Sequence, residues 1–399
     1  MQQNTAMKIL FLTYHGFEEA SGISKKMLAQ VNGLRQNGHE VHVCYYDVTA
    51  QREHVRYVDG LAIKNYGKGW WSTLYQRSSY GCVSNYCRDH AIELIYVRSF
   101  MNASPFTIRL FRQLQKDGVK AVMEIPTYPY DKEFESLPLK YRLEHIADRL
   151  FRRKLASYMN AIVTFSDAEE IFGQRTIRIS NGVDFDSIPL YQPSAVSHHP
   201  SELHFIGVAE VHPWHAFDRF VAGMGEYYCQ QPMTNSPRNA TLSKREHPDV
   251  FFHIVGGVPS DLMAKDYMPL IEKYGLQDKV IFHDKLFGKE LDKVFTQCVF
   301  AVGSLGRHRS GITHIKTLKN REYACRGIPF IYSECDSDFD HQPYVMKAPA
   351  DESPIDIHAV VAFVSSHHFR SEDIRKTVEH LSWKNQMKQV IEQLYTITI

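Results

Sequence analysis

The sequence lacks the short patterns that assign many proteins to a class at once. Its seven cysteines contain no Cys-x-x-Cys pair, and Cys82 and Cys87 stand at a spacing that is poor for a metal site. We interpret the cysteines as isolated thiols of a protein in a reducing compartment. The loop after the first predicted strand has no Gly-x-Gly-x-x-Gly, so a nicotinamide-dependent dehydrogenase is not expected.

Long apolar runs and an excess of one charge are lacking as well. The longest apolar run near the N-terminus, residues 9–14, is too short for a signal sequence or a membrane span, and we therefore expect a cytoplasmic protein. With 46 basic and 45 acidic residues, the net charge of +1 gives no argument for nucleic acid as a partner. Any basic site must be local.

Short apolar runs alternate with helical patterns through the first half of the chain. Residues 8–14 are apolar, and after a loop that contains Gly22 the apolar residues recur at helical spacing over 23–34. Gly38 follows where a helix would end. Further strands are predicted at 39–46, 94–98, 119–125, 161–166 and 176–180, and further helices near 104–117 and 138–159. Such β–α units predict a parallel, doubly wound sheet.

A second series of the same kind follows residues 190–202, which are rich in Pro, Ser and His and read as a linker. Residues 230–248 read as an exposed polar excursion, and the tail, 355–398, is mostly helical by pattern. Strands are predicted at 203–210, 250–257, 280–284, 298–304 and 327–333, with helices near 215–229 and 261–274.

The fold class that these patterns predict is α/β, with two Rossmann-like domains that face a cleft. We place the N-terminal domain at 7–189, the linker at 190–202, the second domain at 203–370 and a C-terminal helical segment at 371–399. Ligands of such sheets bind in the crevice outside the carboxyl ends of the strands.

One segment of the second domain concentrates positive charge. No acidic residue occurs between Lys293 and Arg321, and we expect the cations to stand at the start of a helix. A cation there is unfavourable by about 0.3–1 kcal/mol, so the pattern is understandable if a phosphate occupies the helix start. A solvated basic face that pairs with acids elsewhere is the alternative. The segment contains Arg307, His308, Arg309, His314, Lys316, Lys319 and Arg321.

An acid follows on the same helix. Ile315, Leu318, Glu322 and Cys325 recur at spacings of three and four, which places Glu322 on the inward stripe. A buried carboxylate needs partners, and the two hydroxyls of a ribose would supply two donors. A nearby arginine would satisfy Glu322 equally well, and both interpretations remain open.

Several stretches together resemble one enzyme class over nearly the whole chain. They are EIPTYPYDKE (124–133), SNGVDFDSI (180–188), WHAFDR (214–219), LKNREYACRGIPF (318–330) and the closing helix with Trp383. The chain resembles the GT-B glycosyltransferases, and most of all the retaining glycosyltransferase family 4 in its bacterial capsular and exopolysaccharide branch.

The resemblance implies a UDP- or GDP-linked sugar donor held mainly by the second domain, and a glycan or lipid-linked glycan acceptor on the first. It implies transfer with retention at the anomeric carbon, without a metal or other cofactor. It also implies a C-terminal helix that packs back on the N-terminal domain.

The family pattern also assigns roles in donor binding. Its motif has two glutamates separated by seven residues, and Glu322 takes the second place, which contacts the donor ribose. The first glutamate touches the donor sugar, and its place is taken by His314, our catalytic candidate in this domain. The family's phosphate-binding Arg and Lys are replaced by Glu210 and His215, followed by Ala216.

We expect other cations to compensate for that replacement. Breaking a sugar–phosphate bond builds negative charge on the leaving diphosphate, which needs preorganised cations. Lys319 is the first choice, and Arg309 and Lys316 are further candidates, with His215 as a weaker one that rests on the match to WHAFDR.

In the first domain, Glu124 ends a predicted strand and is the second catalytic candidate. Its carboxylate could face the cleft and orient the acceptor or stabilise the oxocarbenium-like ring; alternatively it anchors the loop. Thr127, Tyr128 and Tyr130 follow as acceptor-binding candidates, since tyrosines stack on sugars. Gly22, at the start of the first helix, would permit close approach of the acceptor or of the diphosphate; the alternative is a turn residue without a binding role.

Two questions of partners stay open. The helix near 138–159 carries six cations among apolar residues, which fits either peripheral contact with the inner membrane or an ordinary solvated helix. A sugar-nucleotide epimerase or hydrolase, and a catalytically silent binding subunit of a polysaccharide assembly complex, are the alternative functions. The replacements at positions 210, 215 and 314 keep the silent subunit under consideration.

Overall fold

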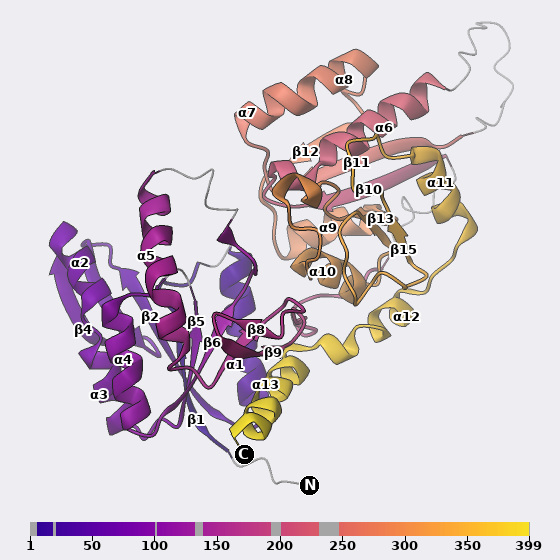
Figure 1. The fold of residues 1–399 in the computed structure, drawn as a ribbon. Helices are drawn as coiled ribbons and strands as arrows, with labels where there is room; N and C mark the ends of the chain where they lie inside the picture. The colour runs from indigo at the N-terminus through magenta and orange to yellow at the C-terminus, as the bar shows by residue number, and fades with distance from the viewer. Residues whose placement is uncertain are drawn as a thin grey trace, which may run out of the picture. The chain divides into compact units, whose positions relative to one another are not determined.

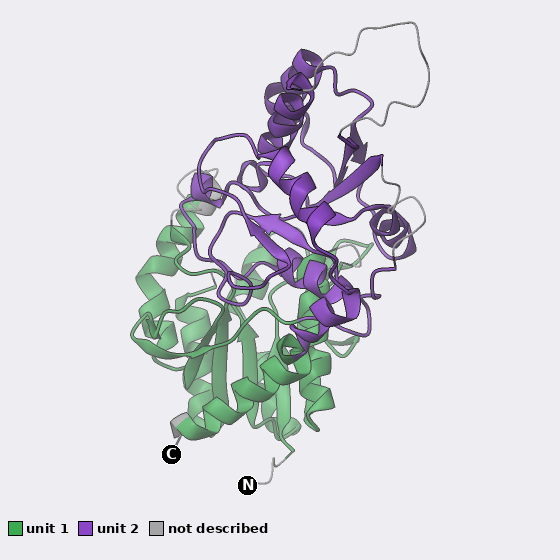
Figure 2. Cartoon of the chain, turned by 90° about the vertical axis from the view of Figure 1, so that its right-hand side faces the viewer, with its two compact units in different colours: residues 1–182, 380–399 green, residues 183–379 purple. Residues whose placement is uncertain are grey.

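The computed structural model describes residues 6–18, 21–99, 102–131, 139–192, 201–230 and 247–398. The chain divides into two compact units: unit 1 comprises residues 1–182 and 380–399, and unit 2 comprises residues 183–379 (Figure 2). Most of the predicted linker and of the predicted polar excursion lies outside the described residues.

Unit 1 is built on a sheet whose described strands run in the order β4-β3-β2-β1-β5-β6-β7-β9-β8 (Figure 1). Strands β1, β2, β5, β6, β7 and β9 are parallel, whereas β3, β4 and β8 join as antiparallel neighbours. The strands are β1 (Lys8–Leu12), β2 (Glu40–Val48), β3 (Glu53–Val58), β4 (Leu61–Lys68), β5 (Leu94–Arg98), β6 (Lys120–Ile125), β7 (Ala161–Thr164), β8 (Glu170–Ile171) and β9 (Gln174–Arg178).

Helices cover both faces of this sheet, and the alternation along β1 shows why. Ile9 and Phe11 belong to one buried cluster and Leu10 and Leu12 to the other, because successive side chains of a strand point to opposite faces. The helices of unit 1 are α1 (Gly22–Gln36), α2 (Trp70–Ser78), α3 (Gly81–Asp89), α4 (Pro105–Lys116), α5 (Leu139–Ala156) and α13 (Trp383–Thr398).

The C-terminal helix α13 packs in unit 1, as expected. Trp383, at its start, is 4 % exposed and belongs to the same cluster as α1 and β1. A Cβ added to Gly182 would lie 2.3 Å from the Trp383 ring, and one added to Gly33 would lie 2.6 Å from the Trp383 carbonyl oxygen. The glycines therefore admit α13 at a distance that other residues would prevent.

Unit 2 has a sheet whose described strands are all parallel, in the order β12-β11-β10-β13-β14-β15. These strands are β10 (Glu202–Val208), β11 (Asp249–Val255), β12 (Val280–His283), β13 (Phe300–Val302), β14 (Phe330–Tyr332) and β15 (Val345–Lys347). The helical segments are η2 (Pro213–His215), α6 (Phe217–Cys229), α7 (Ser260–Leu262), η3 (Met263–Tyr267), α8 (Met268–Tyr274), α9 (Lys289–Gln297), η4 (Arg307–Ser310), α10 (Leu318–Arg326), α11 (Ile357–Ser366), α12 (Ser371–Lys376) and η5 (Glu379–Leu381).

The sequence patterns predicted the strand–helix alternation of both units. They did not predict β3, β4, α2 and α3, which fill residues 53–89, the helix α9, or the short strands β8 and β15. In the described part of the chain, no helix has the length and apolarity needed to cross a membrane.

Candidate functional site

The sheet of unit 2 has a point where its strand order reverses. Strand β10 comes first in the chain but lies between β11 and β13 in the sheet. Strands β11 and β12 are added on one side of β10, and β13, β14 and β15 are added on the other side. Ligands of doubly wound sheets bind at the carboxyl ends of the strands at such a point. Here the segments that follow β10, β13 and β14 provide the surroundings.

Backbone hydrogen bonds tie these segments together. The amides of Leu305 and Gly306 donate to the carbonyls of His215 (2.9 Å) and Trp214 (3.2 Å), and the Ser333 amide donates to the Ser304 carbonyl (2.9 Å). The approach is close, since a Cβ on Gly306 would lie 2.5 Å from the Cβ of Ala216. The segments after β10, β13 and β14 thus form one rigid frame.

Two buried arginines stabilise this frame through hydrogen bonds and an ion pair. Arg219 is 2 % exposed and donates to the carbonyls of Ser353 (2.7 Å), Pro349 (3.1 Å) and Leu305. Arg321 is fully buried and binds Asp336 through both Nη atoms (2.7 and 3.1 Å). These two cations hold protein groups, so the high local charge is partly structural.

Arg309, a predicted donor-binding residue, also pairs with protein groups. Its guanidinium binds the carboxylates of Asp218 (2.9 and 3.2 Å) and Glu352 (2.5 Å) and the carbonyl of Pro213 (3.0 Å). It therefore ties η4 to α6, and its five N–H donors are largely used.

Polar side chains gather within the frame without satisfying one another; we call this set the polar corner. The buried atoms without a hydrogen-bond partner are Ser304 Oγ, Thr317 Oγ1, Lys319 Nζ, Asn320 Oδ1 and Glu334 Oε2. The one hydrogen bond we find within the set joins Asn320 Nδ2 to Glu334 Oε1 at 3.4 Å. Buried polar groups are almost always paired, so a group of exceptions in one place is a candidate binding site.

Binding of a ligand would change the protonation states of Lys319 and Glu334 in the polar corner. Burial lowers the pKa of Lys319, and the neighbouring Arg307 guanidinium lowers it further, whereas Glu334 opposes them. Burial raises the pKa of Glu334 despite the cations nearby. His215, 6 % exposed, has a lowered pKa because it is buried and because Lys319 and Arg307 lie close. An incoming anion would stabilise the charged form of Lys319.

The polar corner can therefore bind a ligand that carries an anionic group and several hydroxyl groups. It offers an ammonium group, two side-chain hydroxyls, an amide and an acid that is partly protonated near neutral pH. Among the described residues, no group of three or more His, Cys, Asp and Glu side chains is arranged to hold a metal ion.

The structure brings together two of the predicted donor-binding residues, His215 and Lys319. The prediction that the cations stand at a helix start is correct for Lys319 alone. Helix α10 begins at Leu318, so His314 and Lys316 precede it, because Thr317 takes the extended N-cap conformation. His314 is exposed and forms an isolated parallel bridge with Cys335.

The prediction that Glu322 lies on a buried stripe is wrong. Its side chain is 32 % exposed, and its carboxylate binds Arg326 at 3.0 Å, one helical turn later. The inward face of α10 is set instead by Tyr323, whose hydroxyl donates to the Val302 carbonyl (3.1 Å) and accepts from the Val208 amide (3.0 Å). Glu322 therefore points away from the buried face of α10. Of the two interpretations, a ribose partner or an arginine partner, the structure shows the arginine partner, Arg326.

Glu124 lies within unit 1 as a buried hub. Its carboxylate is 0 % exposed and accepts from Gln30 Nε2 and the Tyr96 hydroxyl (both 2.5 Å), with Lys26 Nζ at 3.4 Å and Arg98 Nη1 at 3.5 Å. Burial alone would raise the pKa of Glu124, but the two cations and the hydrogen bonds lower it. The carboxylate is enclosed by α1 and β5 and does not face a cleft in this structure, so of the two alternatives the contacts favour a structural anchor; its catalytic role stays a prediction.

The acceptor-binding candidates follow β6. Tyr128 and Tyr130 each meet the Phe172 ring edge to face, with ring centroids 5.9 and 6.2 Å apart, and the Tyr130 hydroxyl donates to Asp148 (2.8 Å). Thr127 is half-buried beside them. Gly22 is the first residue of α1, as predicted, and a Cβ there would meet no atom within 4 Å. Their acceptor-binding roles stay predictions.

Sequence reasoning missed four members of the polar corner: Ser304, Thr317, Asn320 and Glu334. Glu334 follows the predicted strand at 327–333, and it could have been found by the argument applied to Glu124, since both acids stand where a parallel strand ends. The roles of Ser304, Thr317 and Asn320 follow from burial without partners, which no sequence pattern signals.

No protein-family model and no curated protein matches the sequence, but solved structures match its fold. Sucrose-phosphate synthase from Thermosynechococcus elongatus has a TM-score of 0.65 and 14 % identity over 98 % of this chain and 99 % of that one. The catalytic domain of starch synthase IV from Arabidopsis thaliana, bound to ADP and acarbose, has a TM-score of 0.60 and 13 % identity over 99 % and 100 %. Anabaena HepE in complex with UDP has a TM-score of 0.59 and 12 % identity over 98 % and 100 %. The chain is thus an α/β protein with the GT-B fold.

Proposed function

We propose that the protein is a retaining, metal-independent glycosyltransferase that moves a sugar from a UDP- or GDP-linked donor to a glycan or lipid-linked glycan in bacterial surface polysaccharide synthesis. The observation that carries the proposal is the polar corner, an unsatisfied set of polar groups at the strand-order reversal of unit 2. Structures of the same fold contain UDP, UDP-glucose or ADP, which supports a nucleotide-sugar donor.

The chemistry of the polar corner fits the leaving group of this reaction. Cleavage of the sugar–phosphate bond places growing negative charge on the diphosphate, and preorganised cations stabilise it. Lys319 would take up a proton as the diphosphate binds, since the anion raises its lowered pKa. The protonated fraction of Glu334 would donate a hydrogen bond without repelling the phosphate.

The experiment is a thermal-shift titration with UDP, GDP, CMP, dTDP and ADP. We expect one of these nucleotides to raise the melting temperature of the wild type and Lys319→Met to lose at least tenfold in its affinity, because the cation is gone. Lys265→Met, at an exposed position of the same unit, removes the same charge and serves as the control. No response to any nucleotide, or an unchanged response in Lys319→Met, would contradict the proposal.

A catalytically silent binding subunit is the second candidate. It is favoured by the pairing of Glu322 with Arg326, which occupies the carboxylate that the resemblance assigns to the donor ribose. Nucleotide binding without sugar release or transfer in any acceptor mixture would favour this candidate, whereas turnover that His314→Ala abolishes would exclude it. Turnover without any acceptor would indicate an epimerase or hydrolase.

A lipid-linked acceptor would require membrane contact, and unit 1 has a surface suited to it. Helices α2, α4 and α5 are neighbours (Figure 1), and the Arg77 guanidinium of α2 binds Glu144 of α5 at 2.9 Å. We call their exposed large apolar side chains the apolar face. It consists of Trp70, Trp71, Leu74, Tyr75, Phe106, Leu143, Ile146 and Leu150.

Basic residues accompany the apolar face. Arg142, Arg149, Arg153 and Lys154 on α5 are exposed, and Trp70 and Trp71 are 63 % and 68 % exposed. Apolar side chains flanked by cations bind anionic lipid surfaces. We expect sedimentation with vesicles of phosphatidylglycerol and phosphatidylcholine, and at least a fivefold loss of bound protein in a Trp70→Ser, Trp71→Ser variant. Ile23→Ser, an exposed apolar residue of α1, is the control; equal binding by all three proteins would contradict a role for this face.

A further inference from the structure

Unit 1 contains a buried arginine that pairs with no acid among the residues that the structure describes. Arg56 on β3 is 0 % exposed. Its Nε lies 3.4 Å from the Tyr66 hydroxyl, but Nη1 and Nη2 have no hydrogen-bond partner. The groups that act most on its charge are the Cys44 thiol and the hydroxyls of Tyr66 and Tyr80. Burial raises the pKa of all three, so they are neutral at physiological pH.

The other buried arginines of the described chain show what is missing. Each of them forms an ion pair with a carboxylate: Arg98 with Glu124, Arg219 with Asp351, Arg321 with Asp336, and Arg326 with Asp292. A buried charge without an opposite charge is strongly unfavourable, and pairing with a carboxylate is the usual remedy. Among the described residues no carboxylate pairs with Arg56, which points to an anion supplied from outside.

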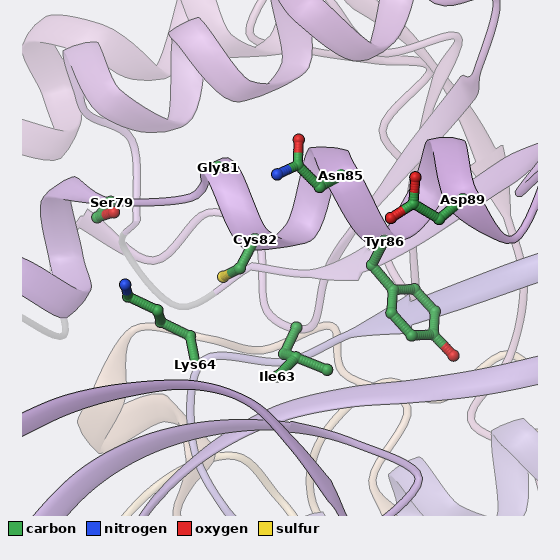
Figure 3. A pocket seen from close by; sticks show the side chains of 8 residues that line it. All are labelled: Ile63, Lys64, Ser79, Gly81, Cys82, Asn85, Tyr86 and Asp89. Carbon is green, nitrogen blue, oxygen red and sulfur yellow. The ribbon is translucent and has the colours of Figure 1, made fainter.

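A pocket of about 570 Å³ lies on the other side of the Tyr66 hydroxyl from Arg56: two of its lining residues, Ser79 and Cys82, contact that hydroxyl, and Arg56 itself does not line it. Strand β4 contributes Ile63 and Lys64, and the segment of Ser79 and α3 lines the opposite side (Figure 3). The pocket is lined by Ile63, Lys64, Ser79, Gly81, Cys82, Asn85, Tyr86 and Asp89. Its volume falls within the range of about 300–1,000 Å³ that small-molecule sites have.

Tyr66 separates the pocket from the arginine. Its hydroxyl donates to the carbonyl of Ser79 (3.1 Å) and lies 3.5 Å from Cys82 Sγ, and both of these residues line the pocket. The same hydroxyl accepts from Arg56 Nε. Displacement of the Tyr66 hydroxyl by a ligand would free Arg56 Nε and the pocket-lining Ser79 carbonyl at the same time.

We propose that this pocket binds a small ligand through a phosphate or carboxylate group that reaches Arg56. The two unpartnered Nη groups match the paired oxygens of such an anion, which is the geometry that guanidinium groups bind most strongly. Lys64 supplies a second cation at one end of the pocket, and Asp89 stands at the other end (Figure 3). The anion therefore enters at the Lys64 end, and the rest of the ligand extends toward Asp89.

This site lies in unit 1 and is independent of the polar corner in unit 2, so its test does not rest on the proposed transferase function. The probes are inorganic phosphate and glucuronate, titrated by calorimetry into the wild type and into Arg56→Met. We expect saturable binding of at least one probe by the wild type and a loss of at least tenfold in Arg56→Met. Binding of phosphate alone or of glucuronate alone identifies the kind of oxyanion.

Controls separate this binding from other effects. Arg112→Met, at an exposed position of α4, removes the same charge and is expected to bind like the wild type. Lys319→Met is also expected to retain binding, which excludes phosphate held in the polar corner. Arg56→Lys keeps the buried charge but loses the paired geometry, and we expect it to fold and to bind at least tenfold more weakly. Wild-type protein that binds neither probe, or equal binding by Arg56→Met or Arg56→Lys, would overturn the proposal.

Discussion

At the scale of single residues, the position of one nitrogen atom explains most of the behaviour expected of Lys319. Its Nζ is buried and has no hydrogen-bond partner, although the stem of the side chain is half-exposed. Burial and the Arg307 guanidinium lower the pKa of Lys319, while in the unfolded chain it takes the ordinary value of about 10.4. The ligand-free protein therefore contains a charge that it would be more stable without.

This gives a prediction with a defined sign. Between the lowered pKa of Lys319 and about pH 10.4 the unfolded chain binds more protons than the folded one, so this residue makes wild-type stability rise with pH. Lys319→Met should be more stable than the wild type by about 1–2 kcal/mol at pH 6, and the difference should vanish near pH 10. Urea unfolding of both proteins across this range measures it. A variant less stable than the wild type at pH 6 would show that Lys319 is a structural residue.

Residues also show where sequence reasoning stops. Lys319 was chosen because cations at a helix start are rare, and the structure places it in the first turn of α10 with its Nζ buried; its donor-binding role stays a prediction, as does that of His215, which came from the resemblance. Glu322 was misjudged because a three- and four-residue spacing was extended to Ile315, which precedes the helix. Ser304 and Asn320 were not considered, because their importance comes from burial without partners, which depends on the packing of β13, β14 and α10.

At the scale of elements, three neighbouring strands of unit 2 carry a row of histidines. His204 on β10, His253 on β11 and His283 on β12 are joined by ring nitrogens 2.9 and 3.0 Å apart. A neutral imidazole has one donor and one acceptor, so the row is consistent when all three are neutral. Burial lowers the pKa of each histidine, and that of His253 falls to about 3.

The row should make unit 2 sensitive to acid. Since the pKa values are lower in the folded state than the unfolded value of about 6.5, stability is lost as the pH falls below 6.5. For His253, which is 4 % exposed, the loss at pH 5 relative to pH 7 is about 2 kcal/mol. His253→Gln keeps hydrogen-bonding groups but cannot titrate, and we expect a smaller loss between pH 7 and 5. His341→Gln, an exposed histidine, is the control; equal acid sensitivity of all three proteins would refute the argument.

The elements that the patterns predicted are those whose apolar residues have a clear period. Strand β5 was placed at its observed bounds, and the start of α1 was recognised from Gly22 and the spacing after it. Strands β3 and β4 were missed because they form an antiparallel hairpin at the sheet edge, where the exposed side carries polar residues. Strand β13 was predicted too long, because the residues after Val302 are buried in the frame of the polar corner and look like strand in sequence.

At the scale of the whole molecule, unit 1 is discontinuous in sequence. Residues 380–399 complete it after all of unit 2, and Trp383 is the main side chain at this return. We expect Trp383→Ala to destabilise unit 1 by about 3–5 kcal/mol. The nucleotide response of unit 2 should be unchanged, because Trp383 belongs to the buried cluster of unit 1.

Differential scanning calorimetry combined with the nucleotide titration distinguishes the outcomes. Tyr395→Ala, at a half-buried position of the same helix, provides the control and should have a smaller effect. An equal loss of stability in both units would contradict the prediction and would mean that the two units unfold as one.

The return of α13 to unit 1 has a consequence for how the chain is made. A ribosome adds about 5–20 residues per second, and domains generally fold in order as they emerge. Here the cluster that joins α1 and β1 needs Trp383, Met387 and Val390, which emerge only after residues 183–379. Unit 2 can therefore complete its fold before unit 1 does. For about 10–40 seconds, the time needed to synthesise residues 183–379, the first 182 residues lack α13, and the apolar surface that α13 covers stays exposed. During that interval the unfinished unit 1 is a natural client for chaperones that bind exposed apolar segments.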